Sequence, residues 1–354
     1  MSSCLVTVIC LFLNFDKQPS YQLDEIGLLR KHGAKIEYSP EGNIIKVIFP
    51  LKIDSNGHYR TVPSVVFRAI RSLPSLRQLD LSYTNFSDED AQYIVGLSLL
   101  ESLTLCGTDI SDNGVNCIAS AKLKKLRHLD LSSTKKIHGD CYKELVRFEG
   151  LQSLYLIGKI IATDTETQAL ASLKQLLTIR LCWTRLRPGQ LRLILESLQN
   201  LEHLDITGCD FSDVDVHVIG KLNNLRSLDL SFTKITGIAL KELRSIPHLN
   251  SLSLCRTDIS GENMTYIGSL QSLTELKLDG TNITNSDLTY VSKIKTLRVL
   301  TISRTSISDG GAKILRYMIW LEKLKISRTE ITPAGYVRLN EDLFKTDIEY
   351  EIYN

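Results

Sequence analysis

The segment LRSLDLSFTKI (225–235) recurs with substitutions through most of this chain of 354 residues. Its pattern is L-x-x-L-x-L-x-x-T-x-I, and LTELKLDGTNI (273–283) follows the same pattern. Such a fixed period indicates a solenoid, in which each repeat buries its apolar side against the next repeat. The first leucine returns every 24 to 26 residues, at Leu76, Leu100, Leu126, Leu151, Leu176, Leu201, Leu225, Leu249, Leu273, Leu297 and Leu321.

The spacing inside one repeat predicts a short strand, a loop and a short helix. Positions four and six alternate with position five, so the leucines at four and six point inward and the fifth residue points outward. Later in the repeat, Leu240, Leu243 and Ile246 have the spacing of one helix face. A Ser or Thr before such a helix is a suitable N-cap, and we expect Ser260, Thr284 and Ser308 in that role.

The ninth position of the repeat carries a small polar residue in nearly every copy. A threonine hydroxyl there can hydrogen-bond loop backbone of its own and neighbouring coils, which would otherwise be buried without a partner. The exception is Lys159. The ninth positions are Thr84, Thr108, Thr134, Lys159, Thr184, Cys209, Thr233, Thr257, Thr281, Thr305 and Thr329.

The pattern resembles the leucine-rich-repeat family over residues 76 to about 340. The period near 24 residues, with Thr at the ninth position, is similar to the bacterial-type repeats of that family. Most members carry Asn or Cys at the ninth position. The resemblance implies an α/β solenoid shaped as a right-handed horseshoe, with a parallel sheet on the concave face and short helices on the convex face. It also implies protein–protein interaction through the concave strands.

We expect four parts along the chain. The hairpin at 35–49 turns at Glu41–Gly42–Asn43, and its second arm and a helix at 64–73 form a degenerate first repeat. The parts are an apolar N-terminal segment (1–21), an N-terminal cap with that repeat (22–75), eleven repeats (76–344) and a C-terminal capping strand (345–354).

The N-terminal run CLVTVICLFLNF (4–15) bears on localisation. It is long enough for the core of a signal peptide but too short to span a bilayer. No Lys or Arg precedes it, and no small-x-small cleavage site follows it. We therefore expect a cytoplasmic protein without a membrane span, with secretion or export as the alternative. The eight cysteines form no C-x-x-C pair, which favours reduced, apolar packing residues.

The net charge of the chain is only +2, so it excludes few classes of binding partner. Its distribution on the outward positions five and eight is more informative: acids dominate the early and middle repeats, and bases dominate from Arg256 onward. Aromatic and arginine side chains most often anchor interfaces, and Arg180, Trp183 and Phe232 are the strongest candidates. The predicted binding residues are Tyr83, Tyr155, Arg180, Trp183, Asp205, Asp229, Phe232, Arg256, Lys277, Arg304, Lys325 and Arg328.

An ordinary solvated surface of mixed charge, with the aromatic rings packed on one another, explains the same residues. Both interpretations stay open at this point. Irregular coils at 157–167 and around Arg187–Pro188–Gly189 favour a binding site there, although sequence drift explains them as well.

The sequence predicts a monomeric, non-enzymatic scaffold that binds a protein partner, with no cofactor and no metal. One alternative is nucleic-acid binding through the basic C-terminal repeats, which we expect to be unfavoured because aromatic residues for base stacking are scarce there. A hydrolase using His203, Asp205 and Asp229 is the least favoured alternative, because an open, wet surface does little to exclude water.

Overall fold

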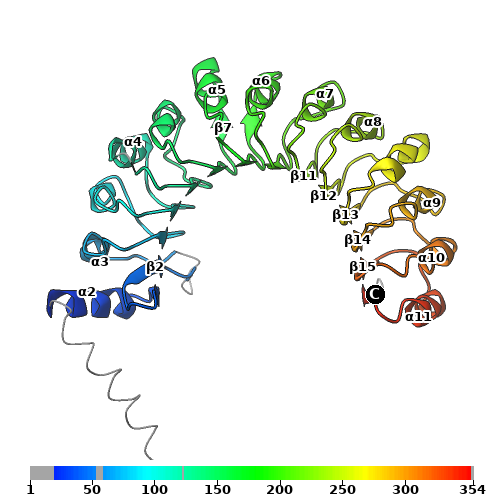
Figure 1. Cartoon of the computed structure of the whole chain (residues 1–354), viewed down its shortest axis with the longest axis horizontal. Helices are drawn as coiled ribbons and strands as arrows, with labels where there is room; N and C mark the ends of the chain where they lie inside the picture. The colour runs from blue at the N-terminus through cyan, green and yellow to red at the C-terminus, as the bar shows by residue number, and fades with distance from the viewer. Residues whose placement is uncertain (1–19, 53–58, 122, 352–354) are drawn as a thin grey trace, which may run out of the picture. The chain divides into compact units, whose positions relative to one another are not determined.

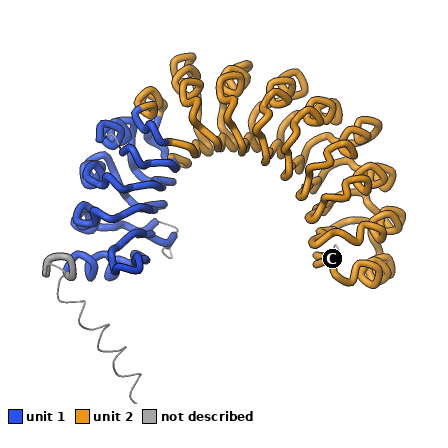
Figure 2. Tube along the Cα trace, in the orientation of Figure 1, with its two compact units in different colours: residues 1–130, 134–137, 147–150 blue, residues 131–133, 138–146, 151–354 orange. Residues whose placement is uncertain are grey.

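The computed structural model describes residues 20–52, 59–121 and 123–351. The apolar run 4–15 and the last residues of the expected capping strand (352–354) lie outside this part of the chain. The chain divides into two compact units (Figure 2). Unit 1 comprises residues 1–130, 134–137 and 147–150, and unit 2 comprises 131–133, 138–146 and 151–354.

Unit 1 begins with a helix and a hairpin and continues as repeats. The strands β1 and β2 pair antiparallel, and β2 then pairs parallel with β3, with Val47 opposite Leu79. The hairpin expected at 35–49 is present, and its second arm joins the parallel strands of the repeats. The elements are α2 (Ser20–Lys31), β1 (Lys35–Tyr38), β2 (Ile44–Ile48), α3 (Ser64–Ile70), β3 (Gln78–Asp80), η2 (Ala91–Tyr93), β4 (Ser102–Thr104), α4 (Asp112–Ser120) and β5 (His128–Asp130).

Unit 2 is an arc of successive strand–loop–helix coils, with its parallel strands on the inner side and its helices on the outer side (Figure 1). A 3-10 helix, η3 (Tyr142–Arg147), lies where the chain passes from one unit to the other. The inner strands are β6 (Ser153–Tyr155), β8 (Thr178–Arg180), β10 (His203–Asp205), β11 (Ser227–Asp229), β12 (Ser251–Ser253), β13 (Glu275–Lys277), β14 (Val299–Thr301), β15 (Lys323–Lys325) and β16 (Asp347–Glu349).

Two short strands, β7 (Ile160–Ile161) and β9 (Arg185–Leu186), form a separate parallel pair in the loops of unit 2. The outer helices are short, and no helix in the described ranges combines the length and apolar character needed to cross a bilayer. They are α5 (Asp164–Ala171), α6 (Gln190–Ser197), α7 (Val216–Ile219), α8 (Ala239–Leu243), the 3-10 helix η4 (Gly261–Ser269), α9 (Leu288–Val291), α10 (Asp309–Leu315) and α11 (Pro333–Asp342).

The core of each coil consists of the leucines of the repeat. Leu225, Leu228 and Leu230 have at most 1% of their surface exposed, and Leu240 and Leu243 of the following helix are fully buried. Burying one such side chain contributes about 1.5–3 kcal/mol. Because each coil supplies the same apolar positions, the strand and helix predicted for the repeat form together and cover the same core.

The predicted threonine ladder is confirmed, and it uses two kinds of acceptor. In most coils the hydroxyl donates to the carbonyl three residues earlier, as Thr257 does to Leu254 at 2.5 Å. Thr184 instead donates to the Leu156 carbonyl of the preceding coil at 2.9 Å. Lys159 occupies the ladder position of its coil and is buried as well.

The predicted helix N-caps are only partly correct. Ser308 accepts a hydrogen bond from the Gly310 N–H, as an N-cap does. Ser260 occupies the cap position but accepts no such bond. Thr284 is not a cap, because its N–H and hydroxyl donate to the carboxylate of Asp287, which is itself the N-cap residue of α9. The Asp287 carboxylate therefore closes the loop back onto Thr284, and the helix begins at Leu288.

Replacing Thr257 by Val tests the ladder. The exchange keeps the shape of the side chain but removes the hydroxyl that donates to the carbonyl of buried Leu254. We expect the free energy of unfolding in urea to fall by about 1–3 kcal/mol, because the carbonyl is left without a partner. Thr257→Ser retains the hydroxyl donor, and its free energy of unfolding should fall clearly less. Equal decreases in the two variants would argue against a structural role for the hydroxyl.

Candidate functional site

The inner face of unit 2 carries two rows of outward side chains, fixed by the register of the strands. Position three forms one row, in which His203 lies opposite Ser227 and Ser227 opposite Ser251. Position five forms the second row, in which Asp205 lies opposite Asp229. Parallel strands lie about 4.8 Å apart, so side chains in one row are direct neighbours. The register therefore brings together residues about 25 positions apart in the chain.

These rows enclose a hollow of about 410 Å³ over strands β6 to β13. Its walls are mostly polar and carry both signs of charge. It contains five of the predicted binding residues, and His203, Ser227, Ser251 and Glu275 join them. The lining residues are Tyr155, Thr178, Arg180, His203, Leu204, Asp205, Ser227, Leu228, Asp229, Ser251, Ser253, Glu275 and Lys277.

An ion pair lies toward each end of the hollow. Arg180 donates through Nε to Asp205 Oδ2 at 3.2 Å, and its guanidinium lies 5.0 Å from the centre of the Tyr155 ring. Glu275 accepts hydrogen bonds from Ser251 at 2.8 Å and binds the Lys277 ammonium at 3.0 Å. Burial raises the pKa of Glu275, but the bonds from Ser251 and Lys277 outweigh it, and the pKa is lowered. Both cations of the hollow are thus engaged.

The aspartates at position five also close the turn that follows their strand. Asp205 accepts from the Thr207 N–H at 3.1 Å and from its hydroxyl at 2.7 Å. Asp229 accepts from the Ser231 N–H at 2.9 Å. Within the described ranges, His203 forms no hydrogen bond to either carboxylate. The geometry thus brings the three proposed hydrolase residues together without a base–carboxylate pair, and it gives both acids a structural role.

Position eight of the repeat has a left-handed backbone, a feature not predicted from the sequence. Trp183, Phe232 and Arg256 have φ values of 55°, 57° and 56°. Such a conformation costs a residue with a side chain about 1–2 kcal/mol, and glycine adopts it freely. Glycine at this position in four other coils was the signal that could have revealed it: Gly107, Gly158, Gly208 and Gly280.

Trp183 and Phe232 form an aromatic pair across the intervening coil. Their ring centres are 5.5 Å apart with an interplanar angle of 51°. The indole lies over Gly208, where an added Cβ would clash with the Trp183 ring. The rings do pack on one another, yet Trp183 remains 55% exposed and Phe232 50% exposed. Neither interpretation from the sequence is therefore complete, since the pair is both packed and open to solvent.

The aromatic residues predicted with them are placed differently. Tyr83 belongs to unit 1, where its ring centre lies 4.9 Å from that of Tyr59. Its interaction with Cys106 raises the pKa of Tyr83 to about 12. Tyr155 lies in unit 2 but lines the hollow under Arg180 rather than joining Trp183 and Phe232.

In the basic end expected from Arg256 onward, the lysines of the inner strands are paired with acids. Lys325 binds Glu349 at 2.7 Å, and Lys323 binds Asp347 at 3.7 Å. Both acids belong to β16, which pairs with β15 and places them opposite the lysines. Of the predicted residues in this region, Arg256, Arg304 and Arg328 have exposed side chains at position eight. Of the two interpretations left open by the sequence, a surface of mixed charge accounts for these lysines.

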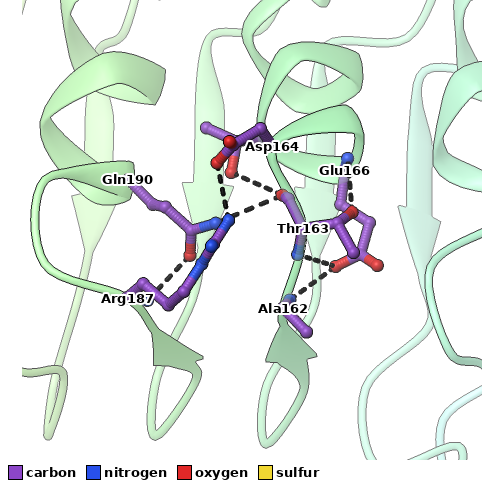
Figure 3. Close-up of polar contacts among 7 residues, drawn as sticks. Ala162, Thr163, Asp164, Glu166, Arg187 and Gln190 are labelled. Atoms are coloured by element: carbon purple, nitrogen blue, oxygen red, sulfur yellow. Dashed lines mark hydrogen bonds and ion pairs between the residues drawn. The ribbon is translucent and has the colours of Figure 1, made fainter.

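Polar contacts on the loops of unit 2 hold the irregular coils together (Figure 3). The Arg187 side chain donates to Asp164 at 2.6 Å, and the buried Gln190 side chain bonds the Arg187 N–H at 2.7 Å and the Thr163 carbonyl at 3.2 Å. Glu166 and Thr163 form a capping box at the start of α5. These bonds link adjacent coils next to the short strands β7 and β9, the second of which follows Trp183 in the chain.

Comparisons with known proteins agree on the repeat. Leucine-rich-repeat family models match residues 199–259 and 72–95. An internalin (inlF) from Listeria monocytogenes is similar in structure, with a TM-score of 0.60 and 17% identity over 94% of this chain and 95% of that one. A leucine-rich-repeat protein of Leptospira interrogans has a TM-score of 0.54 and 19% identity over 82% and 75% of the two chains.

A third similar structure is the mouse RP105/MD-1 complex, with a TM-score of 0.54 and 20% identity over 75% of this chain and 45% of that one. No curated protein matches the sequence. At these identities the structural likeness shows the fold alone, and it agrees with the repeat pattern in the sequence.

Replacing Gly208 by Ala tests whether the Trp183 indole packs over this residue. In Gly208→Ala the new methyl group is strained by the left-handed backbone and also clashes with the Trp183 ring. In Gly158→Ala the backbone is left-handed as well (φ 74°), but no atom lies within 4 Å of the added methyl group. We expect a loss of about 1–2 kcal/mol in unfolding free energy for Gly158→Ala and about 1–3 kcal/mol more for Gly208→Ala. Only Gly208→Ala should shift the tryptophan fluorescence; an unchanged spectrum would contradict this placement of the indole.

Proposed function

Because the chain is a leucine-rich-repeat protein, we propose that it is a non-enzymatic scaffold that binds a protein partner on the inner strand surface of unit 2. The centre of this surface comprises the aromatic pair, Trp183 and Phe232, and the polar hollow beside it. We propose that Arg256 and Arg304 extend the same surface along the later coils.

The aromatic pair is the observation that carries this proposal. Two large rings are half exposed, and each sits on a backbone conformation that glycine adopts without cost. A partner that covered the two rings would bury their apolar surface. The neighbouring coil already holds the rings in position. Aromatic side chains held in this way are typical anchors of protein interfaces.

The polar hollow complements the rings. Interfaces combine an apolar centre with a polar, hydrogen-bonding surround, and the serines and ion pairs of the hollow supply such groups. The similar mouse structure is a complex of RP105 with MD-1, which supports protein binding as the function of this fold. The nucleic-acid alternative has less support, because Lys277 and Lys325 are bound to Glu275 and Glu349.

The double variant Trp183→Ala/Phe232→Ala tests the proposal. Proteins captured by the immobilised full chain would be identified by mass spectrometry, and their affinity for each variant would then be measured by calorimetry. Removing one interface anchor costs about 2 kcal/mol or more, so we expect at least a thirtyfold loss of affinity.

The matched control is Leu193→Ala/Val214→Ala, which removes two apolar side chains that are 53% and 80% exposed outside the inner strands. It should retain the partner. The proposal is wrong if the aromatic variant, with its cooperative melting intact, binds every captured protein as tightly as the control does.

A further inference from the structure

The middle of the hollow contains a carboxylate that is only half engaged. Asp229 Oδ1 accepts the Ser231 N–H at 2.9 Å. In the described part of the chain, no Lys, Arg or His side chain forms an ion pair with Asp229, whereas Arg180 and Lys277 are bound to Asp205 and Glu275. The second oxygen of Asp229 is therefore available to a group that enters the hollow.

The charges of the hollow favour a cation there. Three carboxylates and two cationic side chains line it, and both cations are already held by carboxylates at its ends. The nearest neighbours of Asp229 on the adjacent strands are Asp205 and Ser253, neither of which is positive. An incoming anion would meet uncompensated negative charge, whereas an incoming cation would relieve it.

The size of the hollow fits a long side chain rather than a single ion. Its volume of about 410 Å³ far exceeds the share of one water molecule, about 30 Å³. His203, Ser227 and Ser251 line the same space and can hydrogen-bond an elongated polar group. A bare metal ion lacks a ligand set, because in the described ranges no three His, Cys, Asp or Glu side chains gather as a metal site.

We infer that this hollow binds a basic side chain, lysine or arginine, of the partner, with its ammonium or guanidinium group bonded to Asp229. The inference rests on the proposed function, since it takes the partner to be a protein. Phe232 follows Asp229 in the same coil, and Trp183 follows Arg180. The partner segment therefore carries an apolar residue for the aromatic pair close to the basic residue for the hollow.

The turn bonds of Asp229 provide a clean way to remove its charge. Asn keeps an Oδ1 acceptor for the Ser231 N–H, so Asp229→Asn retains the turn and loses only the negative charge. Asp80 in unit 1 stands at the same repeat position and accepts from the Ser82 N–H at 2.9 Å. Asp80→Asn is therefore a matched control that makes the same exchange outside the hollow.

The test is a titration of the full chain with N-acetyl-arginine amide and its neutral isostere, N-acetyl-citrulline amide. The His203 ring lines the hollow, and its NMR signals, assigned with His203→Asn, report occupancy. We expect a saturable shift with the arginine compound and at least tenfold weaker binding of the citrulline compound. Asp229→Asn should abolish this preference, and Asp80→Asn should leave it unchanged.

Equal affinity for the two compounds, no saturable shift, or a preference that survives in Asp229→Asn would overturn the inference. The contrast between the compounds is measured on the unaltered chain, so it holds even if a variant folds poorly. Failure of the proposed function looks different: arginine would still bind the hollow, but no captured protein would depend on Trp183 and Phe232. The titration can also fail while the capture experiment succeeds: arginine is not preferred, but the aromatic variant still loses the captured partner. That result would reject the basic side chain in the hollow and leave the protein-binding function standing.

Discussion

The structure depends on the parallel register between successive coils. Leu204 lies opposite Ile179 on one side and Leu228 on the other, and the same alignment recurs from strand to strand within unit 2. Because side chains alternate across a strand, a slip of one residue would turn the buried leucines outward and the charged residues inward. The burial of leucine therefore enforces the register, and the register in turn sets every neighbour on the inner face.

One consequence is that a side chain at position eight packs against the next coil rather than against its own coil. The Trp183 indole rests over Gly208, and the Arg256 side chain lies against Gly280 in the same way. A large residue at position eight fits where the following coil has glycine, so side-chain size is coupled between repeats. The aromatic pair exists because Gly208 leaves space between two coils that each carry a ring.

A second consequence is that charge is organised across strands. Arg180 finds Asp205 on the next strand, and Lys325 finds Glu349 on the strand after its own. These pairs are partly exposed, and such pairs typically contribute about 0–1 kcal/mol each. In the hollow, the pairs Arg180–Asp205 and Lys277–Glu275 engage both cationic side chains, and Asp229 has no ion pair within the described part of the chain.

The sequence by itself determined the repeat, its strand and helix, the inward leucines and the threonine ladder, because each follows from spacing within about 25 residues. The period of the repeat also places Asp205 and Asp229, and likewise Arg180 and Asp205, at the same position of adjacent coils. These features need no knowledge of side-chain packing.

Only the tertiary structure decided how the outward residues are used. The left-handed backbone at position eight, the packing of Trp183 on Phe232 and the pairing of Lys325 with Glu349 depend on atoms supplied by other coils. The acid that neutralises Lys325 lies beyond the last repeat, so counting charges along the repeats overstated the basic end. Side-chain direction and exposure arise from packing between coils, which the pattern of one coil does not contain.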